Sequence, residues 1–569
     1  MDARKRQRTL LEKVLHILNT LHSVFLDSNI IFVEQAPRMC YVFLGGEFAL
    51  NLFKERLVFM SNVACFLGID CGLSTAKVSL YDYQGPEIST VSASPSVLHP
   101  APGHVECDLE ANWTVIAGLI RQLLDAAHIP PEHVLSVCCT GHGNGLYVLD
   151  RNGRPLQPGI TSLDARSTAI LHKWQEENLV SRTRPINGQG LWNGQTLPLM
   201  RWQLEERPET LEKVHTLLCS KDYVKFKLTG EINSDYSEMS KVGLLDIKQR
   251  RYSQELLALL GIENFLPALP PLFESGSICG RIHQDAASET GLRKGTPVIS
   301  GLADIDACAL GAGVIHSDEM CIITGTWSIN EALTDHYVES EDLFGISLYP
   351  VTGLYLLLEA SATSAANLAW FIDNLLPQAR EKCEKEGLSI YEFCDRMVQS
   401  SPAGSDSLVF HPFVYGSHQK SEASAAFLGI KGWTSQAQII RAVYEGIAFA
   451  HRVHVDRLRG AGARAQAARL TGGLAKSDVW AQMAANILNL GLELTTDKEL
   501  GTKGCMICGA VGCGLYQNIN EAVEHAVTIA KTFEPQESVR KYYDDKYARF
   551  KATLEKAEPL WEILANSDG

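Results

Sequence analysis

Short apolar runs that end in small polar turns recur along this chain, and the first of them lies within residues 65–82. The run 65–69 ends in Asp70, and the turn Gly72-Leu73-Ser74-Thr75 separates it from residues 77–82, which read as a second strand. Runs of this length between glycines and small polar residues predict strand, turn and strand. Such a turn lets backbone N–H groups and hydroxyls approach a phosphate, and Asp70 could hold a water on Mg²⁺. An ordinary hairpin with a polar turn is the alternative.

A buried strand is predicted at 134–140, and it runs into the loop Gly141-His142-Gly143-Asn144-Gly145. Glycine-rich loops at strand ends are places where ligands approach the backbone in open α/β sheets. We interpret Asn144 as a ligand to a hydroxyl. For His142 we favour a histidine on a surface loop.

Two further segments carry acids that could act on a ligand. Asp164 and Arg166 end another predicted strand, and residues i and i+2 share a face, so they either pair with each other or meet one ligand. The predicted strand 298–300 breaks at Gly301, which places Asp304 at the start of a helix of small residues, where the helix dipole stabilises an anion. A capping role without chemistry is the alternative for Asp304, and Asp306 is the nearest competitor for any acid role.

The second half of the chain repeats the rhythm of the first. Residues 319–330 again read as strand, small turn and strand, and 355–361 as a third strand. Residues 468–480 predict a strand, the pair Gly472-Gly473 and a helix. Two similar halves with phosphate-type turns indicate a duplicated α/β unit with a nucleotide between the lobes.

Composition narrows the class of protein. The chain has 569 residues, 46% hydrophobic and 21% charged, and a formal net charge of −15. This acidic balance argues against nucleic-acid and anionic-membrane partners. Fifteen cysteines without a spacing framework indicate reduced thiols in a cytoplasmic protein. Residues 505–508 form a Cys-x-x-Cys that reads as part of a helix, where a redox or metal role is disfavoured.

Residues 1–59 differ from the rest of the chain. A basic start and an amphipathic pattern over 10–25 predict a helix, and charged residues 12 and 13 interrupt the apolar core that a signal peptide would need. We expect 1–59 to be an extension of doubtful nativeness upstream of a start at Met60. A helical extension that packs on a partner is the alternative.

Several ordered motifs make residues 64–550 resemble the FGGY family of carbohydrate kinases, and within it the kinases of xylulose and L-xylulose. The matching motifs are Gly68-Ile69-Asp70-Cys71-Gly72, Asp164-Ala165-Arg166, Leu228-Thr229-Gly230, Gly301-Leu302-Ala303-Asp304, Gly325-Thr326-Trp327, Glu359-Ala360-Ser361, 444–449, and Thr471-Gly472-Gly473 with Ser477 and Trp480.

The resemblance implies an α/β fold of two actin-like, ribonuclease-H-like lobes, 60–313 and 314–569, with MgATP and a sugar in the cleft between them. Asp304 would be the catalytic base, Asp70 would bind Mg²⁺ through water, and Asn144, Asp164 and Arg166 would lie beside the sugar. The ATP-binding residues would be Ser74, Thr75, Gly325, Thr326, Gly472, Gly473 and Ser477, with Gly325 and Thr326 at the transferring phosphate and 472–473 on the adenosine side. A homodimer is a further expectation.

The sequence also departs from the family pattern. Many xylulose kinases carry Met-His where this chain has Gly143-Asn144, which weighs against ordinary D-xylulose. Trp327 replaces a frequent serine, and the nucleotide segment reads Lys503-Gly504-Cys505-Met506; both changes bear on local packing more than on chemistry.

Three functions follow from these observations. The first is a kinase that phosphorylates a ketopentose with ATP. The second is a kinase of the same fold for glycerol, a tetritol or a sugar acid. The third is a non-catalytic sugar or nucleotide sensor, against which Asp304 and the two phosphate-type hairpins argue.

Overall fold

The computed structural model describes residues 35–36, 39–40, 64–325, 327–404, 407–416 and 423–565. The chain divides into two units, Met1–Asn62 and Val63–Gly569. In the first unit, β1 (Gln35–Ala36) pairs antiparallel with β2 (Met39–Cys40), and the predicted helix over 10–25 lies outside the described residues. The second unit contains all the motifs discussed above.

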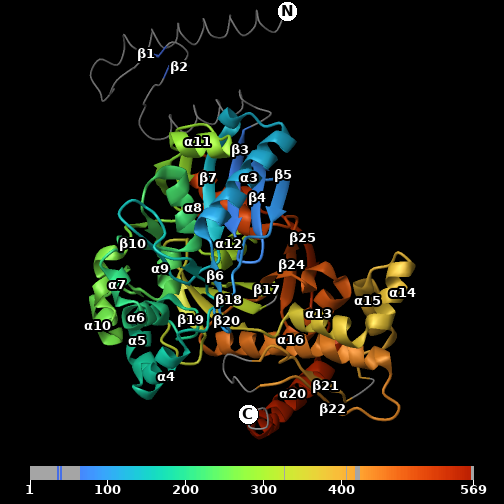
Figure 1. Cartoon of the computed structure of the whole chain (residues 1–569). Helices are drawn as coiled ribbons and strands as arrows, with labels where there is room; N and C mark the ends of the chain where they lie inside the picture. Colours follow the sequence, from blue (N-terminus) through green and yellow to red (C-terminus); the bar gives the residue numbers. More distant parts are fainter. Residues whose placement is uncertain are drawn as a thin grey trace, which may run out of the picture. The chain divides into compact units, whose positions relative to one another are not determined.

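A mixed sheet of six strands forms the core of the first half of this unit, in the order β15-β16-β7-β3-β4-β5 (Figure 1). Its strands are β3 (Cys65–Cys71), β4 (Ala76–Asp82), β5 (Glu87–Ala93), β7 (Val134–Gly141), β15 (Ile278–Arg281) and β16 (Pro297–Ile299). Helix α3 (Leu109–Ala127) packs on β4 and β5, and α8 (Ser220–Thr229) packs on β7. Asp108 caps α3 by accepting from two backbone N–H groups, as its position before the apolar repeat predicts.

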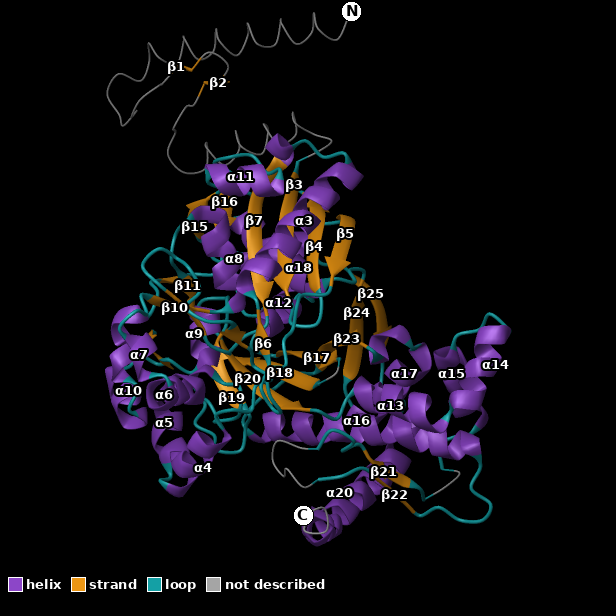
Figure 2. Cartoon of the chain, viewed as in Figure 1, coloured by secondary structure: helices purple, strands orange, loops and turns teal. Residues whose placement is uncertain are grey.

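A second mixed sheet of seven strands forms the core of the other half, in the order β19-β20-β18-β17-β23-β24-β25 (Figure 2). Its strands are β17 (Glu319–Thr324), β18 (Ser328–Thr334), β19 (Gly345–Leu348), β20 (Tyr355–Ser361), β23 (Ala467–Gly472), β24 (Gly491–Thr495) and β25 (Ile529–Phe533). The long helix α16 (Gln436–Gly460) packs on β18 and β20, and α17 (Asp478–Leu488) packs on β24.

The two sheets share one topology. In each, three adjacent antiparallel strands (β3-β4-β5 and β17-β18-β20) join a parallel pair (β7-β16 and β23-β24) through the first strand of the three. The duplication predicted from the sequence rhythm is therefore confirmed, and so is the two-lobed α/β fold. The lobe boundary near residue 313 stays a prediction.

Two helices of small residues lie against each other between the sheets. Helix α12 (Asp304–Gly311) follows the first sheet, and α18 (Leu500–Gly512) comes from the far end of the chain but packs on β3 and β7. A Cβ on Gly504 would lie 2.3 Å from the carbonyl oxygen of Ala307, and one on Gly311 would lie 2.1 Å from that of Leu500. Glycine at these two positions thus permits backbone contact between the helices.

The remaining elements surround the two sheets. Small helices α4 to α7 and α10 form a group beside β19 (Figure 1), whereas α13, α15 and α20 pack on α16 or α17, and α14 packs on α13 and α15. Their bounds are α4 (Thr168–Glu176), α5 (Leu179–Asn187), α6 (Thr196–Glu206), α7 (Pro208–Leu211), α9 (Tyr236–Val242), α10 (Gln254–Leu260), α11 (Gln284–Thr290), α13 (Ala365–Leu375), α14 (Pro377–Lys385), α15 (Ile390–Ser400), α19 (Ile519–Ala526) and α20 (Glu537–Ala565).

The short strands and 3₁₀ helices are β6 (Glu106–Cys107), β8 (Tyr147–Leu149), β9 (Gly159–Ile160), β10 (Thr216–Leu218), β11 (Ser234–Asp235), β12 (Leu245–Asp246), β13 (Arg251–Tyr252), β14 (Leu272–Phe273), β21 (Val409–His411), β22 (Ala426–Leu428), η1 (Pro131–His133), η2 (Glu263–Ala268) and η3 (Leu474–Lys476). Within the described parts of the chain, no helix is both long and apolar enough to cross a membrane. The cysteines from Cys65 to Cys513 carry free thiols, and Cys505 and Cys508 are buried in α18.

Candidate active site

A cavity of about 240 Å³ lies between residues of the two halves and contains the predicted base at its wall. The first half contributes side chains from the 142–144 loop, the 162–192 segment, α9 and the start of α12, and the second contributes 327–329, β19 and β20. The residues used below are His142, Gly143, Asn144, Gln189, Trp192, Glu238, Lys241, Asp304, Trp327, Phe344 and Ser347. The aromatic rings give the cavity an apolar side, and the carboxyl, amide and amine groups give it a polar one.

Asp304 is the first residue of α12, and its partly exposed side chain lines the cavity. Ala303 occupies the cap position, so Asp304 does not cap the helix, and its Oδ1 accepts from the N–H of Ile305 at 2.8 Å. Burial raises the pKa of the Asp304 carboxyl, while this N–H and the charge of Lys241 oppose the rise. A carboxylate with a raised pKa beside a small cavity can accept a proton from a bound alcohol.

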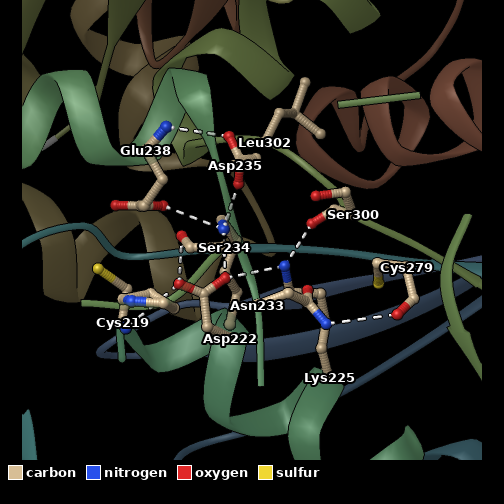
Figure 3. A network of polar contacts seen from close by, with 12 residues as sticks. Cys219, Asp222, Lys225, Asn233, Ser234, Asp235, Glu238, Cys279, Ser300 and Leu302 are labelled. Atoms are coloured by element: carbon tan, nitrogen blue, oxygen red, sulfur yellow. Dashed lines mark hydrogen bonds and ion pairs between the residues drawn. The ribbon is translucent and has the colours of Figure 1, made fainter. Parts of the chain in front are cut away.

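Three hydrogen bonds hold the segment 300–303 that leads into Asp304. The ammonium of Lys225 donates to the carbonyl of Ser300 at 2.6 Å, a bond drawn in Figure 3, and Thr140 Oγ1 donates to the carbonyl of Leu302 at 2.8 Å. The hydroxyl of Ser237 accepts from the N–H of Ala303 at 3.0 Å. These buried contacts from β7, α8 and α9 fix the backbone that carries the base.

The glycine-rich loop brings Asn144 to the cavity, as its predicted role requires. Asn144 has a left-handed backbone, with φ at +64°, and its Oδ1 accepts from the N–H of Thr196 at 3.4 Å. His142 also lines the cavity, although the sequence favoured a surface histidine. Its Nδ1–H donates to the carbonyl of Cys71 at 2.8 Å, so its Nε2 accepts from Tyr147 Oη at 2.7 Å. Burial lowers the pKa of His142, which keeps the ring neutral.

Lys241 and Asp306 form a charged pair at the same wall. The ammonium contacts both carboxylate oxygens of Asp306, at 2.7 and 2.8 Å, and Ser347 Oγ at 2.8 Å. Asp306 is fully buried, which removes it as a competitor for a base that must touch a ligand. Burial raises the pKa of Asp306 to about 6 against the lowering effect of Lys241.

Asp164 and Arg166 are placed differently from the sugar contact that the resemblance implies. Asp164 Oδ1 accepts from Arg166 Nε at 2.8 Å, and Arg166 also pairs with Glu106 at 2.7 Å. Their side chains are 0% and 1% exposed, and neither lines the cavity. The structure therefore has the first alternative that the sequence left open, in which Asp164 and Arg166 pair with each other. Glu106, 60 residues earlier in the chain, completes this buried cluster of charges.

The predicted nucleotide turns of the second half meet at one sheet edge. Strands β17 and β23 are parallel, with Thr324 opposite Gly472, so the turns after both strands lie side by side. The N–H of Gly473 donates to the carbonyl of Thr324 at 2.6 Å, and that of Leu474 donates to its hydroxyl at 3.0 Å. Gly325 is exposed, whereas Thr326 lies outside the described residues.

The other predicted ATP-binding residues occupy two different places. Ser74 is exposed and Thr75 partly exposed in the turn between β3 and β4, and a Cβ on Gly72 would lie 2.4 Å from the carbonyl oxygen of Thr75. Ser477 begins α17: its hydroxyl accepts from Trp480 N–H at 3.0 Å and donates to Asp395 at 2.8 Å. Serine is a preferred N-cap residue, so its place before the predicted helix could have indicated this capping function.

Asp70 is the last residue but one of β3, and its carboxyl lies close to the start of α18, where a Cβ on Gly501 would lie 3.2 Å from Oδ2. Burial raises the pKa of Asp70 to about 7, the charge of Asp304 adds to the rise, and Lys77 opposes it. Two neighbouring carboxylates that repel each other are suitable oxygen donors for a divalent cation. Among the described residues, no group of three His, Cys, Asp or Glu side chains could hold a metal alone, so Mg²⁺ would need water and ligand oxygens as well.

Several cavity residues were missed in the sequence. Glu238 falls in a stretch that reads as a polar loop, but the structure has helix α9 there, with Asp235 as its cap. An acid cap followed by Glu three residues later is a helix-start pattern that could have been used. Trp192 and Phe344, with ring centroids 6.4 Å apart, come from segments without a recognisable motif.

Comparison with known proteins decides the family. The N-terminal domain of the FGGY family of carbohydrate kinases matches residues 65–311, and its C-terminal domain matches 320–513. The chain belongs to this family. It is 33% identical to the L-xylulose/3-keto-L-gulonate kinase of Escherichia coli (strain K12) over 486 residues, 85% of this chain and 95% of that protein. It is 32% identical to the probable L-xylulose kinase of Pasteurella multocida (strain Pm70) over 489 residues, 85% of this chain and 97% of that one.

A solved structure supports the fold of this FGGY kinase. The xylulose kinase from Rhodospirillum rubrum superposes with a TM-score of 0.80 and 24% identity, covering 87% of this chain and 99% of its own. The resemblance seen in the motifs is thus confirmed, and the protein is a carbohydrate kinase with the two-lobed fold of the family. The sequence expectation of a sugar-kinase enzyme, as opposed to a non-catalytic sensor, is also supported.

Proposed function

We propose that this kinase transfers the γ-phosphoryl group of ATP to a hydroxyl of a ketopentose of the xylulose or L-xylulose type. The observation that carries the proposal is Asp304 at the wall of a cavity lined by both halves. Its volume of about 240 Å³ lies just below the range of about 300–1,000 Å³ typical of drug-sized ligands, which favours a monosaccharide-sized occupant.

In this proposal Asp304 accepts the proton of the attacking hydroxyl, and Asn144 helps to orient the sugar. Trp192 and Phe344 offer apolar surface to its C–H groups. Phosphoryl transfer depends on in-line positioning and charge stabilisation, with a carboxylate near the attacking oxygen. The turns at 72–75, 325 and 472–473 would lie against the phosphates and the adenosine side of ATP.

Mg²⁺ would neutralise charge on the phosphates when bound. Asp70 would contact it through water, because its carboxyl is a hard oxygen donor under repulsion from Asp304. A homodimer, the further expectation from the resemblance, can be checked by light scattering during gel filtration.

Coupled assays of ADP release test the proposal on a panel of ketopentoses, glycerol, tetritols and sugar acids. We expect the highest kcat/KM with a ketopentose. A higher kcat/KM with a polyol or a sugar acid would favour the second candidate function, a kinase for glycerol, a tetritol or a sugar acid. Tight sugar binding without turnover of any compound would leave only the sensor.

A further inference from the structure

Glu238 is a buried acid at the cavity wall that none of the predicted roles uses. It lies in α9 and is 0% exposed, and neither of its carboxyl oxygens has a hydrogen-bond partner. Its nearest cation is the ammonium of Lys221, 3.7 Å from Oε2, which is beyond hydrogen-bond distance. A buried carboxyl without a hydrogen bond is costly to the folded state, so its presence in a ligand cavity suggests a use.

Lys221 cannot fully compensate Glu238, because two other acids already hold its ammonium. Asp222 and Asp235 contact Lys221 Nζ at 2.7 and 2.5 Å. Figure 3 shows Glu238 at the margin of this network, with its backbone N–H bound to Asp235 and one carboxyl oxygen joined to the network by the ion pair with Lys221. Burial raises the pKa of Glu238 to about 8, the charge of Lys221 opposes the rise, and Asp235, Asp222 and Asp304 add to it.

Gly143 leaves space beside this carboxyl. A Cβ on Gly143 would lie only 2.9 Å from Glu238 Oε1, so any residue other than glycine at position 143 would push the carboxyl aside. Gly143 and Glu238 both line the cavity. The position at which this chain departs from the Met-His of many xylulose kinases therefore faces the unpartnered acid.

The other charged groups of the cavity make it unfavourable for an anion. Its charged lining residues are Glu238, Asp304 and Lys241. Lys241 is held by Asp306 and Ser347, and His142 is neutral with both ring nitrogens bonded. A carboxylate on the sugar would therefore meet the carboxylate of Asp304 and no uncommitted cation among the described lining residues.

We infer that Glu238 forms a hydrogen bond with a hydroxyl of the bound sugar, in a cavity that Asp304 and the committed Lys241 restrict to uncharged polyhydroxy sugars. This inference rests on the proposed function and narrows its substrate class. It excludes sugar acids such as aldonates, which the second candidate function would allow. The bound hydroxyl supplies the partner that both carboxyl oxygens lack.

The test measures equilibrium binding of xylulose and of xylonate to the full chain by calorimetry, together with kcat and KM. Wild type is expected to bind xylulose at least tenfold more tightly than xylonate. Glu238→Leu, which keeps the volume but removes the hydrogen bond, should weaken xylulose binding about tenfold or more without changing the KM for ATP. Glu238→Gln keeps a donor and an acceptor and should restore binding to within about threefold.

A purely structural Glu238 predicts different results. Since Lys221 keeps Asp222 and Asp235 in both variants, removal of an unpartnered buried acid should leave the melting temperature unchanged or higher. A structural role predicts a lower one. The matched control is Glu445→Gln, a glutamate 1% exposed that pairs with Arg441 and Lys546 and does not line the cavity. It should lower the melting temperature and keep the preference for xylulose.

Failure of this inference is distinct from failure of the proposed function. Unchanged xylulose binding by Glu238→Leu, or tighter binding of xylonate by wild type, overturns the inference even if xylulose is phosphorylated. Absence of turnover together with the expected binding pattern overturns the proposed function and leaves the sugar contact of Glu238 in place.

Discussion

Thr324 and Gly472 lie directly opposite each other in the parallel pair of β17 and β23, and their strands end together. Gly472 has a φ of +90°, and a Cβ there would lie 2.5 Å from the carbonyl oxygen of Thr324. The close approach of two turns, which the proposed ATP site needs, thus depends on the absence of a side chain at one residue.

Gly472→Ala is therefore expected to lower the free energy of unfolding by about 1–3 kcal/mol and to raise the KM for ATP. Urea unfolding and initial rates measure the two effects. Gly118→Ala is the matched control, because Gly118 lies within α3 with nothing near its Cβ position, and alanine there should stabilise the helix by about 0.5–1 kcal/mol. An unaltered KM for ATP in Gly472→Ala would argue against this turn as part of the nucleotide site.

Asp304→Ala should lower kcat by at least about 10²-fold, because it removes the proposed proton acceptor. Binding of MgATP, measured by calorimetry, should stay close to wild type. Asp125→Asn, an exposed acid on α3, is the control for loss of a carboxylate. Near-normal turnover by Asp304→Ala would refute the role of the base.

Asp70→Asn should raise the Mg²⁺ concentration for half-maximal activity, since one oxygen donor loses its charge. Chelation of Mg²⁺ should abolish turnover by both proteins, and added Mg²⁺ should restore it. A titration of activity with Mg²⁺ at saturating ATP compares them. Identical Mg²⁺ curves would remove Asp70 from the metal site.

Glu238 should make the stability of the unliganded protein fall as the pH rises. Its pKa lies at about 8 in the folded chain against an ordinary 4.5, so between these values the folded state holds a proton that the unfolded state has released. The free energy of unfolding then decreases with pH in this window. Glu238→Gln should flatten that decrease between pH 5 and 8, as measured by urea unfolding. Equal slopes in both proteins would contradict the raised pKa.

Gly143→Ala tests whether the space beside the Glu238 carboxyl is needed for sugar binding. A methyl group 2.9 Å from Oε1 must displace the carboxyl, so the KM for the sugar should rise about tenfold or more, equivalent to about 1.4 kcal/mol, while the KM for ATP stays unchanged. Gly432→Ala, with open space at its Cβ position, should have no effect on either KM. A sugar KM within twofold of wild type would separate Gly143 from substrate binding.

The sequence predicted local structure well where a strand and its turn are specified by neighbouring residues. The hairpin of β3 and β4, the capped start of α3 and the position of Asp304 at the start of α12 all follow from short patterns. Alternation, glycine and capping residues act over a few positions, so they are visible without the fold.

Side-chain partners from distant segments could not be predicted in this way. Arg166 forms ion pairs with both Glu106 and Asp164, and no pattern near Arg166 in the sequence predicts the pair with Glu106. Glu238 became visible only when α9 placed it against Gly143, nearly a hundred residues earlier. The uncompensated burial of such a carboxyl is a property of packing, which residue patterns along one segment do not contain.

The glycine contact between α12 and α18 bears on how the two lobes would move relative to each other during catalysis. Because α18 packs on both α12 and the first sheet, we expect the acid that begins α12 to move with that sheet, even though α18 lies near the far end of the chain. An alcohol bound there would keep its alignment with its proton acceptor throughout the cycle. Only the donor's phosphate would have to be delivered, by the approach of the opposite lobe.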